Sequence, residues 1–383
     1  MTKGVLKLQE ILRLQMKIVP ELVELLEKRY NILRTIYYKQ PIGRRVLAND
    51  LNLGERIVRT EINFLKDQGL IDINTPGMTV TKDGEHIVNE LQEFIHEIRG
   101  LSNIEKKVKS FLGLKKVIIV PGDTDDNPTI LKDIGKACAN YVKEILNSNS
   151  IIALTGGSTI KEVVEAFPKV NYLSDILVVP ARGGMGRKVE TQANTLAASF
   201  AKKLNGSYKL LHIPENLSPE ILDTLLKQHE VSEVIESIQN ANILIYGIGN
   251  AIEMAEKRGA SIKEIESLKK LGAVGEAFGC YFNKESNVVS YATTVGINIS
   301  EVKSINMNIA VAGGKNKIEP VISTMRNNKN GILVTDEAIG KGIVKCFEDT
   351  NVKVLAIGAK QFVVQDAADI TVSEAFKVFS FTL

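Results

Sequence analysis

Residues 43–81, GRRVLANDLNLGERIVRTEINFLKDQGLIDINTPGMTVT, constrain the fold of this 383-residue chain more than any other segment. Apolar residues recur at helical spacing in residues 44–51 and again in residues 57–65. Gly69 is placed to end the second helix, because a left-handed residue commonly follows the last turn. The apolar positions are Val46, Leu47 and Leu51 in the first helix and Ile57, Val58, Ile62 and Leu65 in the second.

Two short β-type runs follow this helix pair. Residues 70–73 and 78–81 are joined by the turn Asn74-Thr75-Pro76-Gly77, which favours a β-hairpin. Helix, turn, helix and hairpin in this order predict a winged helix-turn-helix, in which the second helix enters the major groove of double-stranded DNA.

Four arginines are the candidate DNA contacts. Arg56 and Arg59 lie on the second helix, where they would reach base edges or phosphates. Arg44 and Arg45 begin the first helix, which crosses the DNA backbone, and phosphate contacts suit them. The alternative is a small helical module with solvated arginines, because exposed charge is ordinary on helices.

Composition limits the possible classes of protein. The chain is long enough for two or three domains, and its apolar fraction of 44% is ordinary for a globular protein. A net charge of only +3 requires a DNA-binding protein to concentrate its positive charge locally, and the excess falls in the N-terminal part. The chain has no tryptophan, which argues against a stacking platform for single-stranded nucleic acid.

Cysteine spacing and hydropathy indicate the compartment. Cys138, Cys280 and Cys346 are far apart and form no metal-ligand spacing, which favours inert thiols in a reducing cytoplasm and predicts no metal site. No apolar run approaches 18 residues, so we expect no membrane span. The charged N-terminus does not resemble a secretory signal.

Helical segments flank the DNA-binding module. Residues 5–38 predict one or two helices, the second of which supports the helix-turn-helix. Residues 85–111 predict a long helix with a heptad-like apolar seam. This helix would either pair two copies of the chain, as a palindromic site requires, or lie on the next domain.

From Lys116 onward, short apolar runs alternate with amphipathic helical segments such as residues 130–146 and 219–237. This pattern predicts a doubly wound, mostly parallel α/β sheet, which binds ligands at the carboxyl ends of its strands. The predicted strands are residues 117–120, 151–154, 176–179, 209–211, 243–246, 309–311 and 332–334.

The strongest candidate binding loop is Gly156-Gly157-Ser158-Thr159, between a predicted strand and a helix. Glycines admit an anion close to the backbone, hydroxyls add donors, and the helix N-terminus supplies free N–H groups. The loop lacks the Walker pattern, so no nucleoside triphosphate is implied. The alternative is a plain strand–helix turn with a hydroxyl cap.

Four weaker loops follow other predicted strands or lie between them. Arg182 stands beside glycines and suits a phosphoryl or carboxylate clamp. Residues 312–317 offer Lys315 and Lys317 to an anion, and Glu276 offers an acceptor to sugar hydroxyls. Residues 247–250 form the last of these four loops. Together these loops describe a site for a small phosphorylated polyol.

With these motifs in this order, the chain resembles the SorC family of sugar-responsive bacterial transcription regulators over about residues 1–345. Its α/β part is similar to glucosamine-6-phosphate deaminase and the ribose-5-phosphate isomerase group, and the similarity includes the Gly156–Thr159 loop. The resemblance, closest to members that control glycolytic genes, implies a repressor with the effector fructose-1,6-bisphosphate. The effector residues implied by position are Gly156, Gly157, Ser158, Thr159, Arg182, Gln192, Glu276 and Lys317, with Lys315 an alternative to Lys317.

The chain departs from the enzymes of this fold at Asn250-Ala251-Ile252. Deaminases of this type carry Asp-Gly-His after the glycines that correspond to Gly247 and Gly249, and their histidine helps to open the sugar ring. The four histidines of this chain lie outside the candidate loops, so no general base is expected there. We therefore expect a binding protein. The alternative is a sugar-phosphate isomerase or deaminase with an accessory DNA-binding module.

The predicted organisation has four parts: a winged helix-turn-helix domain in residues 1–84, a linking or oligomerisation helix in 85–114, an effector domain in 115–345, and an extension of unknown role in 346–383. The expected partners are operator DNA, a sugar phosphate and further copies of the chain, as a dimer or tetramer. No cofactor is expected apart from the effector.

Overall fold

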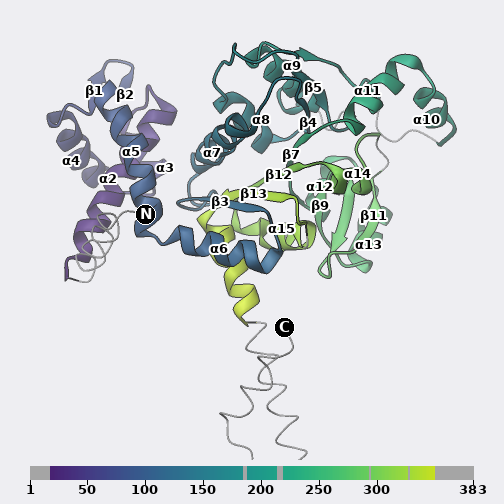
Figure 1. The fold of residues 1–383 in the computed structure, drawn as a ribbon. Helices are drawn as coiled ribbons and strands as arrows, with labels where there is room; N and C mark the ends of the chain where they lie inside the picture. Colours follow the sequence, from purple (N-terminus) through teal and green to yellow (C-terminus); the bar gives the residue numbers. More distant parts are fainter. Residues whose placement is uncertain (1–17, 184–187, 214–218, 293–294, 327, 350–383) are drawn as a thin grey trace, which may run out of the picture.

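The computed structural model describes residues 18–183, 188–213, 219–292, 295–326 and 328–349. A small helical domain with a two-stranded wing lies beside a larger α/β domain, and two helices connect them (Figure 1). The predicted α/β class with an N-terminal winged helix-turn-helix is confirmed.

The N-terminal domain is the predicted winged helix-turn-helix. Its elements are α2 (Pro20–Lys39), α3 (Arg44–Asp50), α4 (Glu55–Asp67), β1 (Ile71–Asn74) and β2 (Gly77–Val80). Leu33 and Ile36 of α2, Leu47 of α3 and Ile62 of α4 are fully buried in one apolar cluster. The long α2 therefore supports both DNA-binding helices, as its apolar pattern indicates.

The end of α4 shows why Gly69 stands where it does. The N–H of Leu70 donates to the carbonyl of Leu65 at 2.9 Å, and the N–H of Gly69 donates to that of Lys66 at 2.8 Å. These two bonds define a Schellman motif, which requires the φ of +70° that Gly69 adopts. The chain then turns directly into the wing.

Two residues assigned to the apolar faces of these helices are exposed. Val46 is 53% exposed and Ile57 is 46% exposed, so the sequence-based assignment was wrong for both. On α4 the buried face runs through Val58, Ile62 and Leu65, and Ile57 lies about 100° around the helix from Val58. Ile57 therefore belongs to the exposed surface of α4.

The single helix predicted over residues 85–111 is two helices. α5 (Lys82–Ile98) ends before Gly100, which has a φ of +65°, and α6 (Leu101–Leu112) begins after it. Ile95 of α5 is buried in the N-terminal domain, whereas Val108 of α6 is buried in the α/β domain. A left-handed glycine between the two helices breaks the heptad seam and lets each half serve a different core.

The large sheet of the described residues has seven strands in the order β3-β13-β12-β7-β4-β5-β6, all paired in parallel. They are β3 (Lys116–Val120), β4 (Ile151–Leu154), β5 (Leu177–Pro180), β6 (Ser207–Tyr208), β7 (Ile243–Gly247), β12 (Met307–Ala312) and β13 (Gly331–Asp336). The predicted strand over 209–211 was misplaced by two residues.

Both faces of this sheet are covered. Alternate residues of a strand point to opposite faces, so Ile152 and Leu154 join one apolar cluster and Ala153 joins the other. The first face packs against α7 (Ile130–Ile145), α8 (Ser158–Ala166) and α9 (Ala193–Lys203). The second packs against α6, α11 (His229–Gln239) and α15 (Ile318–Met325). The helix predicted over 219–237 is divided into α10 (Pro219–Leu226) and α11.

A second, antiparallel sheet was not predicted. It has the order β11-β10-β9-β8, with β8 (Gly249–Asn250), β9 (Ala273–Ala277), β10 (Cys280–Asn283) and β11 (Val288–Tyr291). The helices α12 (Ala251–Lys257) and α13 (Ile262–Lys270) accompany it, and α14 (Ile299–Ser304) leads back to β12. Two short 3-10 turns, η1 (Val189–Thr191) and η2 (Lys315–Lys317), lie in loops of the large sheet.

The α/β domain continues past the expected boundary at residue 345. A helix spans residues 337–349, and its Phe347 ring stacks on Phe111 of α6 with the ring centroids 4.9 Å apart. Most of the predicted extension, residues 350–383, lies outside the described residues. Among the residues described, no helix is long and apolar enough to cross a membrane.

Gly84 gives a first testable prediction. A Cβ at this position would lie 2.7 Å from a methyl of Val80 and still closer to the carbonyl oxygen of Leu70, because α5 starts directly under the wing. Gly84→Ala is expected to destabilise the N-terminal domain by about 1–3 kcal/mol, as overpacking does. Gly43→Ala is the control, since nothing lies within 4 Å of a Cβ there. Equal melting temperatures for the two variants would contradict the prediction.

Candidate functional site

The candidate loops meet at one edge of the large sheet. β12, β7, β4 and β5 are neighbours and run in parallel, so their carboxyl ends lie side by side. Residues 313–317, 248–250, 155–158 and 181–183 follow these four strands in turn. Four of the five predicted loops therefore converge at this edge, where such sheets bind ligands, whereas Glu276 lies on the strand β9 and not in a loop.

The loop from Gly156 to Thr159 is tightly packed on one side. A Cβ on Gly156 would lie 2.6 Å from the carbonyl oxygen of Thr191, and the N–H of Gly157 donates to that oxygen at 2.8 Å. Gly157 has a φ of +118°, and α8 starts at the next residue. Close packing therefore requires a glycine at position 156, and the backbone conformation favours one at position 157. The N–H groups of the first turn of α8 remain suited to an anion.

Gln192 lies beside this loop. It is the N-cap residue of α9, and its carbonyl carbon is 3.6 Å from the position that a Cβ on Gly156 would take. The segment that carries Gln192 therefore forms the wall against which the Gly156–Thr159 loop packs.

A buried cluster of charges joins the large sheet to the small one. Oε1 of Glu276 on β9 lies 3.3 Å from Nη1 of Arg182 and 2.7 Å from Nη2 of Arg258. The same oxygen accepts the N–H of Gly279 at 2.6 Å. The side chains are 4% exposed for Arg182 and Glu276 and 6% for Arg258. Among the described residues, this cluster places two guanidinium groups against one carboxylate, and guanidinium groups are well suited to bind a phosphate or carboxylate ligand.

Sequence analysis missed Arg258. This residue follows α12, 18 residues before Glu276, and no local motif marks it. Its guanidinium also donates to the hydroxyl of Tyr281 at 2.9 Å. Burial opposes the charge of Arg258, but Glu276 and Tyr281 outweigh it and raise the pKa of Arg258. The guanidinium is therefore a fixed positive charge.

The two lysines that sequence analysis could not distinguish lie in different surroundings. Lys317 is 15% exposed, and its Nζ lies 3.4 Å from the Glu253 carboxylate on α12. Burial lowers the pKa of Lys317, although Glu253 acts in the opposite direction. Lys315 is 60% exposed and turns toward the loop after β3, with Nζ 2.5 Å from Asp123. Lys317 is therefore the lysine that contacts α12, the helix that Arg258 of the charge cluster directly follows.

Contacts between the strands connect these groups. The N–H of Gly247 donates to the hydroxyl of Thr155 at 3.2 Å, just before the Gly156–Thr159 loop. Gly249 pairs with Glu276 across β8 and β9. The N–H of Ala181, beside Arg182, donates to the carbonyl of Leu154 at 2.7 Å. The loop, the charge cluster and Lys317 therefore border one region of the sheet edge.

The DNA-binding domain presents all four candidate arginines to solvent. Arg56 and Arg59 are exposed on α4, and Arg44 and Arg45 are exposed at the start of α3. Arg45 lies 3.7 Å from Glu55, and its side chain is 87% exposed, so this ion pair leaves it accessible. The exposed face of α4 also carries Thr60 and Asn63, side chain types that hydrogen-bond to DNA bases.

Comparison with known families identifies both domains. Residues 25–95 match the family described as "CggR N-terminal DNA binding domain", and residues 96–345 match the "Putative sugar-binding domain" family. The chain is 40% identical over 341 residues to the central glycolytic genes regulator of Priestia megaterium, which covers 89% of this chain and 100% of that protein. The chain belongs to the family of central glycolytic genes regulators. A Bacillus subtilis protein of the same name is 38% identical over 338 residues, covering 88% of this chain and 99% of its own.

Solved structures support the SorC resemblance. The "putative SorC family transcriptional regulator" of Enterococcus faecalis is 36% identical with a TM-score of 0.60, covering 63% of this chain and 99% of that one. The full-length sorbitol operon regulator SorC of Klebsiella pneumoniae is 19% identical with a TM-score of 0.60, covering 84% and 98%. The latter likeness shows the shared fold alone. This member of the family is thus a SorC-type transcription regulator with a DNA-binding and a sugar-binding domain.

Proposed function

We propose that this regulator represses an operon of glycolytic genes and that fructose-1,6-bisphosphate is its effector. The observation that carries the effector assignment is the buried Arg182–Glu276–Arg258 cluster, on the same sheet edge as the Gly156–Thr159 loop. The names of the relatives support the choice of genes. Its place of action is the bacterial cytoplasm, and it works as a homo-oligomer, a dimer or tetramer.

The proposed ligand uses both kinds of anion site. One phosphate binds the N-terminus of α8, where Gly156 and Gly157 admit it closely and the hydroxyls of Ser158 and Thr159 donate to it. The other anionic groups and the sugar hydroxyls contact the remaining residues of the edge. These residues are Arg182, Gln192, Arg258, Glu276 and Lys317.

We propose that the site binds its ligand without turning it over. Asn250 stands where the related deaminases continue toward their histidine, and its side chain instead caps α12 by accepting the N–H of Ile252 at 3.0 Å and that of Glu253 at 3.3 Å. A capping amide is committed to the backbone and has no useful proton affinity, so it supplies no general base. Release of product from glucosamine-6-phosphate or ribose-5-phosphate would favour the enzyme alternative.

DNA binding is proposed to use α4 in the major groove, with Arg56 and Arg59 at base edges or phosphates. Arg44 and Arg45 then contact the flanking backbone. The effector reduces repression only if it binds the DNA-incompetent arrangement more tightly than the other one.

Calorimetric titration with fructose-1,6-bisphosphate tests the effector site. Thr159→Ala and Lys317→Gln are each expected to weaken binding by about 1.5–3 kcal/mol, roughly 10- to 150-fold, because each removes a donor to a charged phosphate. Lys284→Gln is the matched control, since Lys284 forms an exposed ion pair with Glu319 on the same domain.

The titration has clear outcomes. Binding by the wild type, weakened in both site variants and retained in Lys284→Gln, supports the proposal. No binding by the wild type removes fructose-1,6-bisphosphate as the effector. Wild-type affinity in both Thr159→Ala and Lys317→Gln places the ligand elsewhere.

A further inference from the structure

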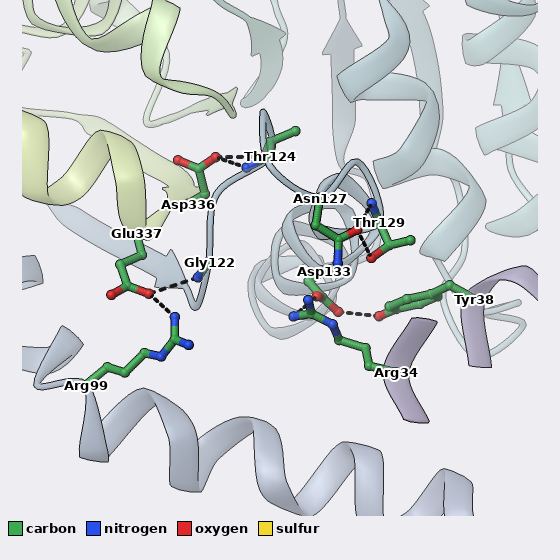
Figure 2. A network of polar contacts seen from close by, with 10 residues as sticks. All are labelled: Arg34, Tyr38, Arg99, Gly122, Thr124, Asn127, Thr129, Asp133, Asp336 and Glu337. Atoms are coloured by element: carbon green, nitrogen blue, oxygen red, sulfur yellow. Dashed lines mark hydrogen bonds and ion pairs between the residues drawn. The ribbon is translucent and has the colours of Figure 1, made fainter. Parts of the chain in front are cut away.

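The two domains are joined by a buried ion pair. Nη1 of Arg34 on α2 lies 3.1 Å from Oδ2 of Asp133 on α7, and both side chains are 3% exposed. The hydroxyl of Tyr38 on α2 donates to the same carboxylate (Figure 2). Removing one partner of such a pair leaves an uncompensated buried charge, so the pair holds the domains in one arrangement.

A second ion pair lies after β13, the strand next to β3. Nη1 of Arg99, at the end of α5, lies 2.5 Å from Oε2 of Glu337, which follows β13. The same guanidinium binds Glu27 on α2 at 2.8 Å. Glu337 also accepts the N–H of Gly122 at 2.9 Å, as Figure 2 shows. Glu337 therefore contacts the loop after β3 and Arg99, and Arg99 in turn binds Glu27 of the DNA-binding domain.

We call residues 121–129, between β3 and α7, the linking loop. On its other side, the linking loop is connected by hydrogen bonds and an ion pair to the loop that leads to Lys317. Oδ2 of Asp336 accepts the N–H of Thr124 at 3.0 Å and the N–H of Gly314 at 2.8 Å. Lys315 Nζ lies 2.5 Å from Asp123 of the linking loop, which raises the pKa of Lys315.

The fit between the two loops leaves little freedom. A Cβ on Gly313 would lie 2.6 Å from the Thr124 hydroxyl, and one on Gly314 would lie 2.6 Å from the carboxylate of Asp125. A displacement of η2 would therefore act on the linking loop, because the two loops are in direct contact at Gly313 and Gly314.

We propose that the linking loop couples occupancy of the effector site to the position of the DNA-binding domain, with Lys315 as the residue that ties the two together. This inference rests on the proposed function, which places Lys317 at the effector. A phosphate that draws η2 toward itself pulls on the Lys315–Asp123 and Gly314–Asp336 contacts. These contacts continue through Glu337 to Arg99. Lys315 is a positioning residue, while Lys317 contacts the ligand.

Hydrogen exchange on the ligand-free, full-length protein tests the connection without any sugar. Lys315→Gln is expected to raise the exchange rates of amides in residues 30–38 of α2 at least threefold, although Lys315 is on the other domain. Lys284→Gln, which removes another exposed lysine from its ion pair with Glu319 on the same domain, should leave them unchanged. Unchanged exchange in residues 30–38 of Lys315→Gln would overturn the proposal.

A second measurement gives the coupling itself. The coupling factor is the ratio of operator Kd with saturating fructose-1,6-bisphosphate to that without it. In Lys315→Gln and Arg99→Gln this factor is expected to move at least fivefold toward one, while the affinity of DNA-free protein for the sugar changes less than threefold. A wild-type coupling factor in both variants would overturn the proposal.

The two experiments separate the possible failures. If the wild type shows no response to the sugar, the proposed effector is wrong, and hydrogen exchange alone decides whether the linking loop connects the domains. If the wild type responds but both variants keep its coupling factor, the effector stands and the linking loop does not carry the signal.

Discussion

Glu276→Gln is expected to lower the stability of the α/β domain by about 3–5 kcal/mol, because it removes the charge of a buried carboxylate that two buried guanidinium groups contact. The amide keeps the shape of the side chain and can still accept the N–H of Gly279, so the loss reports charge and not packing. For a domain of this size the change corresponds to a fall of roughly 6–20 °C in melting temperature.

The control for this variant is Glu319→Gln. Glu319 also accepts from a cation, Lys284 at 2.9 Å, but its side chain is 56% exposed, and such pairs contribute about 0–1 kcal/mol. Thermal unfolding of the two variants in phosphate-free buffer measures the difference. Inorganic phosphate should restore more stability to Glu276→Gln than to the wild type, because an anion replaces the missing charge. Equal melting temperatures for both variants would contradict the prediction.

The second large effect concerns operator binding. Arg56→Ala and Arg59→Ala are each expected to cost about 1–3 kcal/mol, or roughly 5- to 150-fold in Kd, and to relax specificity where the arginine reads a base. Both side chains are exposed and lie away from the buried face of α4, so folding should be unaffected. Fluorescence anisotropy with the operator and with a scrambled duplex measures both quantities.

Arg44→Ala provides the comparison. A phosphate contact carries no sequence information, so this variant should weaken binding to the operator and to the scrambled duplex alike and should reduce the salt dependence. Wild-type operator affinity in both α4 variants would contradict the docking of α4 in the major groove.

The N-terminal domain could be predicted from sequence because its signals are local. α4 ends before Gly69 through local hydrogen bonds from Gly69 to Lys66 and from Leu70 to Leu65, and the Asn74–Gly77 turn sets the hairpin register. The parallel strands were likewise visible, since strands buried on both faces are continuous apolar runs. Ile57 shows the limit, because an apolar residue next to the buried stripe can remain exposed to solvent.

The candidate site was predictable where a loop follows its strand directly, as at Gly156–Thr159. Arg258 was not, because its partner Glu276 is brought to it by the small antiparallel sheet, whose short strands have weak patterns. Charged residues that meet only in the folded chain have no spacing that marks them.

The sequence by itself determined the elements of the winged helix-turn-helix, most strands of the parallel sheet and the loops that directly follow them, because these depend on neighbours within a few residues. Tertiary structure decided which charges meet. It divided the heptad-like segment at Gly100, paired Lys315 with Asp123 and Lys317 with Glu253, and buried Arg34 against Asp133. The physical reason is that burial strengthens an ion pair only where folding removes water from both partners, and that place is fixed by packing between distant segments.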